Sequence, residues 1–283
     1  MTTISNKHVL ITGGASGLGR LLALRCAELG ATVTVWDLNA AGAEAVAAEA
    51  NAVAAAADPR SAGTVHSFAC DVGDREQVYA RADEVRAHVG PVDILINNAG
   101  VVSGRPLLEL PDERIELTFK VNTLALFWTT KAFLPGMIDR GSGHLVNVAS
   151  AAGLIGSPRE TDYAASKFAA VGFNEALRLE LKRSAPGVRT TVICPFYIDT
   201  GMFEGVKTRF PLLLPILRED DVVEHVVKAI QHDRPQVVMP WMVRALPAMR
   251  LLPVGAFDRL ADFFGITAAM DEFTGRKSAA SGG

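Results

Sequence analysis

Cysteine is scarce in this sequence, and the few cysteines are far apart. The chain of 283 residues contains three, Cys26, Cys70 and Cys194. Zinc sites and redox-active dithiols use closely spaced pairs, and small disulfide-stapled folds need more cysteines than this. The six histidines also lack ligand spacing, so we expect them to be solvated or to cap helices. We therefore expect reduced thiols in the core or at strand ends, and no metal site.

An excess of basic charge is also missing. The chain has 28 Lys and Arg residues against 31 Asp and Glu, a formal net charge of −3, and both signs are spread along its length. Proteins that bind a phosphate backbone need a basic patch or stripe. We therefore expect no nucleic-acid partner.

No hydrophobic run is long enough to span a membrane. The longest apolar region, 237–264, is interrupted by prolines and charged residues, whereas a spanning helix needs about 20 nearly uncharged residues. The first expected strand begins within a few residues of Met1, which leaves no room for a secretion signal. These features and the scarce cysteines predict a cytoplasmic protein without a transmembrane segment.

Short apolar or β-branched runs alternate with longer helical patterns along the chain. Such alternation is typical of a parallel sheet whose crossover helices cover both faces. We expect strands at 8–12, 32–36, 65–70, 94–97, 144–149, 190–194 and 236–239. We expect helices at 18–29, 40–56, 75–88, 112–140, 162–184 and 220–231. The sequence thus predicts an α/β fold, a Rossmann-like, doubly wound seven-stranded parallel sheet in a single domain over 1–283.

Prolines predict where several segments end. Pro135 should end or kink the helix at 112–140, and the Ala-Pro-Gly run at 185–187 should close the next helix. After Met239, prolines interrupt segments rich in Leu, Met and Phe. This pattern predicts a hydrophobic C-terminal helical extension over 241–277, which would serve as a substrate lid, a subunit interface or a lipid contact. Residues 278–283 are expected to be a frayed tail.

A glycine-rich turn, Thr12-Gly13-Gly14-Ala15-Ser16-Gly17-Leu18-Gly19, directly follows the first expected strand and precedes a helix. Glycines let backbone N–H groups and a helix N-terminus approach a pyrophosphate closely. Taken alone, such a turn also fits an ordinary strand-to-helix connection. Support comes from Asp37, roughly 20 residues beyond the loop, where an acid can accept hydrogen bonds from the adenosine ribose. The alternative role for Asp37 is a turn or a helix cap near Ala40.

The residues around Asp37 favour NAD over NADP, although NADP stays possible. A carboxylate at this position repels the 2′-phosphate of NADP. Leu38 and Asn39 follow it, and the glycine-rich loop contains no Arg or Lys before Arg20. No cation is therefore expected to hold that phosphate.

The chain resembles the short-chain dehydrogenase/reductase family, whose loop pattern T-G-x-x-x-G-x-G is matched by Thr12, Gly13, Gly17 and Gly19. The resemblance continues at Asp71-Val72, like the family's adenine contact, and at Asn97-Asn98-Ala99-Gly100, like its N-N-A-G segment. The second segment also has a structural reading, because in the family it stabilises the sheet and the turn beneath the cofactor. The resemblance implies that the cofactor is bound by Gly13, Ser16, Gly17, Leu18, Gly19, Asp37, Leu38, Asp71, Val72, Asn98, Ala99, Gly100, Val121, Tyr163, Lys167, Pro195, Ile198 and Thr200.

Tyr163 and Lys167 are four residues apart on an expected helix, so they lie on one face, one turn apart. A free tyrosine has a pKa near 10, and acid–base work at neutral pH requires a value about 3 lower. An ammonium close by, at an effective dielectric constant of about 20, contributes roughly 3–4 kcal/mol. We therefore expect Lys167 to lower the pKa of Tyr163.

The family resemblance implies an ordered catalytic set of Asn122, Ser150, Tyr163 and Lys167. Ser150 would position the substrate oxygen, Asn122 would help hold a water on the proton path, and Lys167 would anchor the nicotinamide ribose. Taken singly, each residue also has a structural explanation. The Tyr–Lys pair could lie on a half-exposed helix face, Ser150 could cap a strand, and Asn122 could be a polar helix residue whose hydrogen bonds are all made within the protein. As a set, they predict hydride transfer between a nicotinamide and an alcohol or ketone carbon.

The later segments resemble the branch that contains retinol dehydrogenases and 17β-hydroxysteroid dehydrogenases. This implies a bulky hydrophobic alcohol, ketone or aldehyde as substrate, and a homo-oligomer, a tetramer or dimer. The backbone near Ile198 would hold the carboxamide of the cofactor. Where the family commonly has Pro-Gly this chain has Pro195-Phe196, so the larger side chain is expected to form a pocket wall. The candidate substrate residues are Leu154, Ile155, Phe196, Tyr197, Met202 and Phe203.

Two other classes of function fit part of the sequence. A non-catalytic dinucleotide-sensing or scaffold protein would keep the glycine-rich loop but has no need of Tyr163 and Lys167 together. An epimerase or dehydratase on the same fold would normally carry a larger C-terminal substrate domain than the stretch after Met239 provides. The dehydrogenase hypothesis uses every motif.

Overall fold

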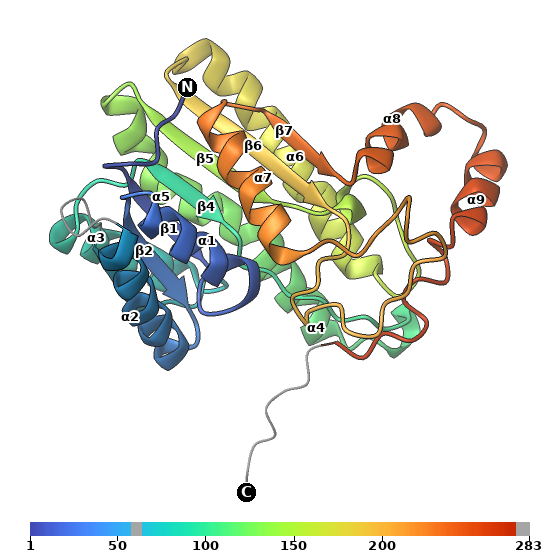
Figure 1. Ribbon diagram of the computed structural model, residues 1–283. Helices are drawn as coiled ribbons and strands as arrows, with labels where there is room; N and C mark the ends of the chain where they lie inside the picture. Colours follow the sequence, from blue (N-terminus) through green and yellow to red (C-terminus); the bar gives the residue numbers. More distant parts are fainter. Residues whose placement is uncertain (58–63, 276–283) are drawn as a thin grey trace, which may run out of the picture.

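Seven parallel strands form one sheet, and Figure 1 shows its twist. The computed structural model describes residues 1–57 and 64–275. The sheet order is β3-β2-β1-β4-β5-β6-β7, and every neighbouring pair is parallel. The predicted doubly wound sheet is therefore confirmed. Its strands are β1 (His8–Thr12), β2 (Thr32–Asp37), β3 (Val65–Ala69), β4 (Ile94–Asn97), β5 (Gly143–Val148), β6 (Val188–Pro195) and β7 (Gln236–Met239).

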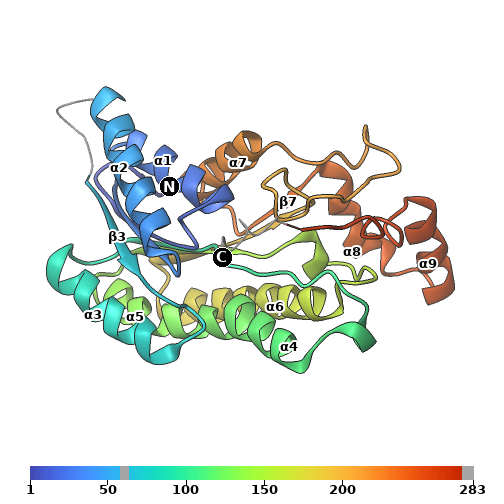
Figure 2. The same cartoon turned by 90° about the horizontal axis from the view of Figure 1, so that it is seen from below.

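Helices cover both faces of the sheet. One layer holds α1, α2 and α7, and the other holds α3 to α6 (Figure 2). The alanine-rich α2 buries Ala43, Ala47, Ala50 and Ala54, so small side chains let it pack closely in the first layer. The helices are α1 (Gly17–Glu28), α2 (Ala40–Ala57), α3 (Arg75–His88), α4 (Asp112–Phe119), α5 (Ala125–Asp139), α6 (Thr161–Ser184) and α7 (Glu219–Gln231).

The predicted helix at 112–140 is two helices. A π-helical turn, Lys120–Leu124, separates α4 from α5. Pro135 does not end α5, which continues to Asp139. The N–H that Pro135 lacks would bond the carbonyl of Lys131, and both residues lie on the exposed side of α5, where water can take the place of that bond. Helix α6 ends at Ser184, as the Ala-Pro-Gly run predicts.

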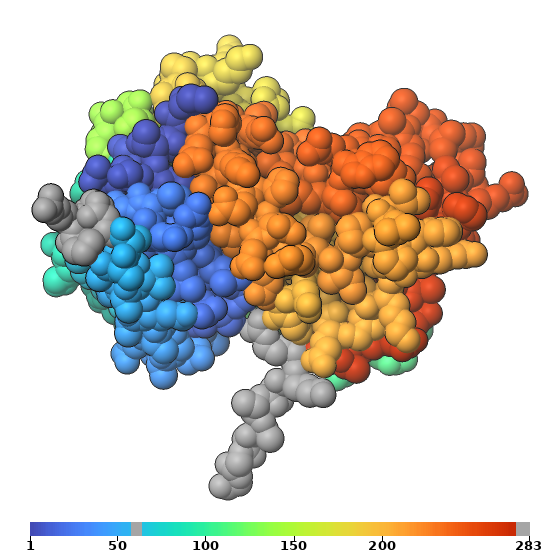
Figure 3. Space-filling view, in the orientation of Figure 1, coloured from blue at the N-terminus to red at the C-terminus, as the bar shows by residue number. Residues whose placement is uncertain are grey.

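The chain after β7 forms short helices, as the sequence predicts. They are a 3-10 helix (Trp241–Ala245), α8 (Leu246–Met249) and α9 (Val254–Phe263). They lie beside the segment around residues 200–217 (Figure 3), where the rings of Phe210 and Phe263 are 5.3 Å apart. Among the described residues no helix is both long and apolar enough to cross a bilayer. The predicted tail at 278–283 lies outside the described residues.

The three cysteines are free and buried, as predicted. The prediction that the histidines are solvated or cap helices is wrong for His8 and His144, which lie buried in β1 and β5. Each ring bonds a threonine hydroxyl on a neighbouring strand, His8 to Thr34 and His144 to Thr191, both at 2.8 Å. Cross-strand partners depend on the register of the sheet, which sequence spacing does not reveal.

Burial lowers the pKa of His144 to about 4. The unfolded chain binds the proton more readily, so stability should fall as the pH decreases from 6.5 to 4 and level off below that. Over this range the free energy of unfolding should decrease by roughly 3 kcal/mol. We expect His144→Gln to flatten this part of the pH profile of the unfolding free energy, measured by urea denaturation. His232→Gln, at an exposed histidine, should leave the profile unchanged; equal profiles for wild type and His144→Gln would contradict the prediction.

Candidate active site

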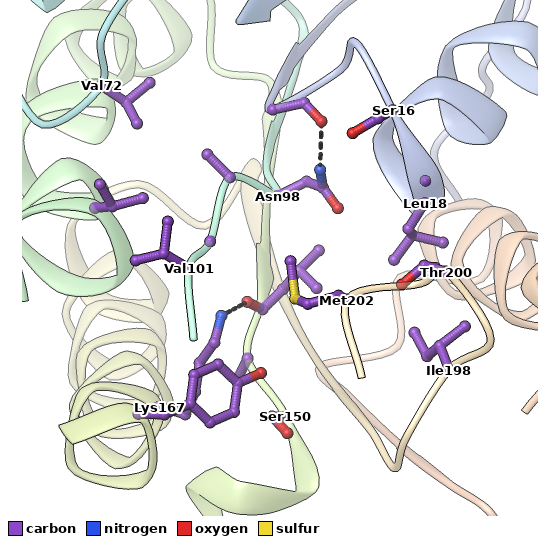
Figure 4. Close-up of a pocket in the computed structure, with 18 of the residues that line it drawn as sticks. Ser16, Leu18, Val72, Asn98, Val101, Ser150, Lys167, Ile198, Thr200 and Met202 are labelled. Carbon is purple, nitrogen blue, oxygen red and sulfur yellow. Dashed lines mark hydrogen bonds between the residues drawn. The ribbon is translucent and has the colours of Figure 1, made fainter. Parts of the chain in front are cut away.

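A pocket of about 360 Å³ opens at the carboxyl ends of the strands, beside β1 and β4, where the strand order reverses. Doubly wound folds bind ligands at such a switch point. Loops after six strands, β1 to β6, contribute to its lining, which Figure 4 shows in part. The predicted cofactor residues in the lining are Gly13, Ser16, Gly17, Leu18, Asp37, Leu38, Asp71, Val72, Asn98, Ala99, Gly100, Val121, Tyr163, Lys167, Pro195, Ile198 and Thr200.

Gly19 is the one predicted cofactor residue outside this lining. A Cβ on Gly19 would lie 2.1 Å from the carbonyl oxygen of Gly13 and 2.6 Å from Nδ2 of Asn98. Gly13 has φ +64°, and a Cβ there would lie 2.7 Å from Cα of Ala99. The loop is therefore a cradle with no room for side chains at these two positions, which fits the close approach of a pyrophosphate.

Hydrogen bonds join this loop to the segment after β4. The Thr12 hydroxyl accepts from the backbone N–H groups of Asn98 and Ala99 at 3.0 and 3.1 Å. The Asn98 side chain donates to the carbonyls of Thr12 and Gly13, both at 3.0 Å, and Figure 4 draws one of these two bonds. Asn98 thus stabilises the turn and lines the pocket at once, so its two expected roles coexist.

Asp37 is held by backbone donors on both sides. Its Oδ2 accepts from the Ala15 N–H, and its Oδ1 accepts from the Asn39 N–H, both at 2.9 Å. The side chain of Asn39 accepts from the Gly42 N–H at 3.1 Å and so serves the first turn of α2. Asp37 therefore holds a turn and the glycine-rich loop, while Asn39 takes the expected capping role.

Tyr163 and Lys167 lie on one face of α6, as predicted. Both are buried, and Nζ of Lys167 lies 5.6 Å from the centre of the Tyr163 ring. Nζ also donates to the Val148 carbonyl at the end of β5, at 2.9 Å (Figure 4). The strand end therefore fixes the ammonium beside the phenol.

The expected lowering of the Tyr163 pKa is not observed. Burial raises the pKa of Tyr163, nearby Glu160 adds to the rise, and a hydrogen bond with Ser150 opposes it. Burial also lowers the pKa of Lys167 to about 8. Removal from water penalises both charged forms, so it outweighs the attraction that the spacing alone predicts.

Ser150 combines two roles. Its hydroxyl accepts from the Ala152 N–H at 3.1 Å, which caps the short turn after β5, and it also lines the pocket. The hydroxyl lies 3.5 Å from the Pro195 carbonyl, to which it donates. The strand-cap reading and the expected functional reading are compatible.

Asn122 lies in the π-helical turn and is 1% exposed, beneath the pocket lining rather than in it. Its Oδ1 accepts from the Val101 N–H at 2.8 Å, and its Nδ2 donates to the Val101 carbonyl at 2.9 Å and to the Ser166 hydroxyl at 3.0 Å. Asn122 therefore ties the segment after β4 to α6, which supports the satisfied-polar reading.

The predicted substrate residues fall into three groups. Phe196, Met202 and Phe203 line the main pocket. Ile155 lines a second, apolar cavity of about 40 Å³, which shares Phe196 as a wall. Leu154 and Tyr197 line neither: Leu154 packs in the core, and the Tyr197 hydroxyl bonds a buried carboxyl.

Sequence reasoning missed several lining residues. In the main pocket these are Cys70, Val101, Leu117, Val148 and Ala149. In the apolar cavity they include Leu214, Met242, Val243, Leu246, Met249, Phe264 and Ile266. Apart from Leu214, the signal for the second group was the proline-punctuated hydrophobic pattern after Met239. Within the described residues, no three His, Cys, Asp or Glu side chains gather in a way that could hold a metal ion.

A family model described as short chain dehydrogenase matches residues 7–209, which include the glycine-rich loop and the Tyr163–Lys167 pair. The chain belongs to this family. Human epidermal retinol dehydrogenase 2 is 45% identical over 278 residues, which cover 97% of this short-chain dehydrogenase and 87% of the relative. The resemblance within the family is therefore to the retinol dehydrogenase branch.

Solved structures of the family share the fold. A short-chain dehydrogenase/reductase from Burkholderia phymatum in complex with NAD has a TM-score of 0.76 and 28% identity, over 89% of this chain and 95% of that one. An alcohol dehydrogenase from Thermococcus sibiricus complexed with 5-hydroxy-NADP has a TM-score of 0.71 and 25% identity, over 83% and 96%. This short-chain dehydrogenase is thus an oxidoreductase that uses a nicotinamide dinucleotide.

The tight packing at Gly19 gives a direct test of the cradle. We expect Gly19→Ala to lower dinucleotide affinity about tenfold or more, because the loop must shift to admit the methyl group. Titration followed by protein fluorescence measures this. The matched control is Gly172→Ala in α6, where an added Cβ meets no atom within 4 Å; it should keep affinity and raise the melting temperature by about 2–4 °C. Unchanged affinity in Gly19→Ala would contradict the cradle.

Proposed function

We propose that this short-chain dehydrogenase interconverts a bulky hydrophobic alcohol and its ketone or aldehyde, with Tyr163 as general acid and base. The observation that carries the proposal is the convergence of Tyr163, Lys167 and Ser150 on the pocket at the carboxyl edge of the sheet. The same pocket reaches the glycine cradle and Asp37, so one ligand can span both ends. A scaffold protein would have no use for the buried Tyr–Lys pair.

In this mechanism the nicotinamide, when bound, supplies or accepts the hydride. The Tyr163 hydroxyl donates a proton to the substrate oxygen during reduction and takes it back during oxidation. The raised pKa of Tyr163 keeps the phenol protonated and ready for the reductive direction. The Ser150 hydroxyl positions the same oxygen and stabilises its developing negative charge. Lys167 binds the ribose and favours the transient phenolate through its charge.

We propose NAD as the preferred cofactor. The fixed carboxylate of Asp37 lines the pocket, where it repels a 2′-phosphate. Arg20, the first cation after the loop, pairs with Glu49, with Nε and Oε2 2.9 Å apart. Lys167 is the only Lys or Arg among the described residues that line the pocket. No free cation there is placed to hold the extra phosphate.

The substrate assignment draws on the apolar walls. Phe196, Met202 and Phe203 close the pocket beside Tyr163, and relatives of this chain are named for retinol. Such linings favour a ligand with a large apolar body and one polar end. The cytoplasmic location, the tetramer or dimer, and the role of the C-terminal extension stay predictions.

Tyr163→Phe tests the acid and base. We expect kcat for oxidation of a retinoid or steroid alcohol to fall by about 10²–10⁴-fold, because the variant has no proton to exchange, while NAD affinity is kept. Absorbance at the reduced nicotinamide band gives the rate. Tyr79→Phe, on α3 and away from the pocket, is the matched control and should retain full activity. Equal rates for Tyr163→Phe and wild type would reject the assignment.

Asp37→Asn tests the cofactor preference. The amide removes the negative charge, and its single acceptor oxygen can keep one of the two backbone hydrogen bonds of Asp37. We expect NADP affinity relative to NAD to rise about tenfold, since the repulsion of the 2′-phosphate disappears. Dissociation constants for both dinucleotides, measured side by side, check this. A ratio that stays at the wild-type value would show that Asp37 does not select the cofactor.

A further inference from the structure

A buried acid at the start of α6 is left unused by this mechanism. Glu160 is 1% exposed and immediately precedes the helix that carries Tyr163. Its Oε2 accepts a hydrogen bond from the Tyr197 hydroxyl at 3.2 Å, whereas its Oε1 has no partner among the described residues. A carboxyl group is costly to bury, so its presence at this point calls for a function.

Aromatic contacts lead from this hydrogen bond back to the catalytic tyrosine. The rings of Tyr197 and Phe203 are 5.1 Å apart, and those of Phe203 and Tyr163 are 5.7 Å apart, both edge to face. Tyr163 and Glu160 are three residues apart at the start of α6. The contacts therefore run from Glu160 through Tyr197 and Phe203 to Tyr163, between the start of α6 and the segment after β6.

These contacts also include residues near the end of the described chain. Tyr197 packs in a buried cluster with Val206, Ala269 and Met270, and Phe203 packs against it. The segment after β6 has no regular secondary structure between β6 and α7 apart from the isolated bridge between Ile198 and Leu217. Backbone hydrogen bonds hold parts of this segment, for example from the Phe196 N–H to the Met239 carbonyl at 2.8 Å and from the Thr274 N–H to the Glu204 carbonyl at 2.9 Å. Side-chain contacts add to them around Tyr197 and Phe203.

We propose that Glu160 is a positioning residue whose hydrogen bond to Tyr197 fastens the segment after β6 to α6 and so holds Phe203 against Tyr163. This inference rests on the proposed function, because it assigns the way in which the substrate wall of that site is held. Glu160 itself touches neither substrate nor cofactor in this scheme; it acts through Tyr197 and Phe203.

The charge of Glu160 allows a second test, through the pH dependence of the oxidation rate. Burial and the nearby Asp162 raise the pKa of Glu160 to about 7, and its negative charge in turn raises the pKa of Tyr163. The ionisable neighbours are Asp162 and Tyr163 at the start of α6, Tyr197 on the packed segment and the partly exposed Arg159 next to it in sequence. Asp271, whose carbonyl accepts from Arg159, and Glu272 are exposed. Glu160→Gln, which removes the charge but keeps an acceptor, should thus move the acidic limb of the oxidation rate to lower pH.

The experiment combines three variants of the full chain. Glu160→Leu and Tyr197→Phe each remove the hydrogen bond, so we expect KM for the hydrophobic alcohol to rise about five- to tenfold with a smaller change in kcat. The double variant should be no worse than either single variant, because both remove one interaction. Glu160→Gln should keep KM near the wild-type value and show the shifted pH profile, with Tyr79→Phe as control.

Contrary outcomes are distinct from failure of the proposed function. A wild-type KM in Tyr197→Phe, or effects of Glu160→Leu and Tyr197→Phe that multiply in the double variant, would overturn the fastening role. If Glu160→Leu does not fold, the KM of Tyr197→Phe alone decides the fastening role, because this variant removes the same hydrogen bond. If wild type oxidises no hydrophobic alcohol, the proposed function fails. The interaction between Glu160 and Tyr197 is then measured from the melting temperatures of the two single variants and the double variant. If the decrease in the double variant equals the sum of the two single decreases, the hydrogen bond has no role.

Discussion

Removal of water from the first turns of α6 is the constraint on which the site depends. Tyr163, Lys167 and Glu160 are all buried there, and burial penalises the charged form of each. The pKa values of the phenol and the carboxyl are therefore raised and that of the amine is lowered, so that the neutral form of each group is favoured. Acid–base chemistry in such surroundings depends on small changes in local charge, because nothing screens them.

The sheet supplies the rigid reference for these groups. Lys167 is fixed by the carbonyl of Val148 at the end of β5, and Thr12 at the end of β1 accepts two N–H groups from the segment after β4. Because parallel strands end at a common edge, side chains far apart in sequence are held in fixed relation. The wall after β6 lies outside the sheet, so its aromatic side chains position it together with a few backbone hydrogen bonds to neighbouring segments.

Local pattern was enough to predict most of this arrangement. The alternation of strand and helix patterns depends on neighbouring residues, so it predicted the seven strands and the edge where Ser150 and Tyr163 meet. The π-helical turn at Lys120–Leu124 was missed, because its wider winding accompanies the bonds of Asn122 to Val101 and Ser166. Those contacts join three segments that are far apart in sequence. The hydrophobic periodicity of one segment contains no information about its contacts with the others.

The direction of the Tyr163 pKa shows most clearly where sequence reasoning ends. The i, i+4 spacing correctly placed Lys167 beside the phenol, with its Nζ 5.6 Å from the centre of the Tyr163 ring. The spacing contains nothing about desolvation or about Glu160, which both act in the opposite direction. Tyr197 makes the same point, since it was expected to line the pocket, whereas its ring packs in a buried cluster and its hydroxyl donates to Glu160. The position of a polar group on an apolar wall thus depends on the buried group with which it forms a hydrogen bond.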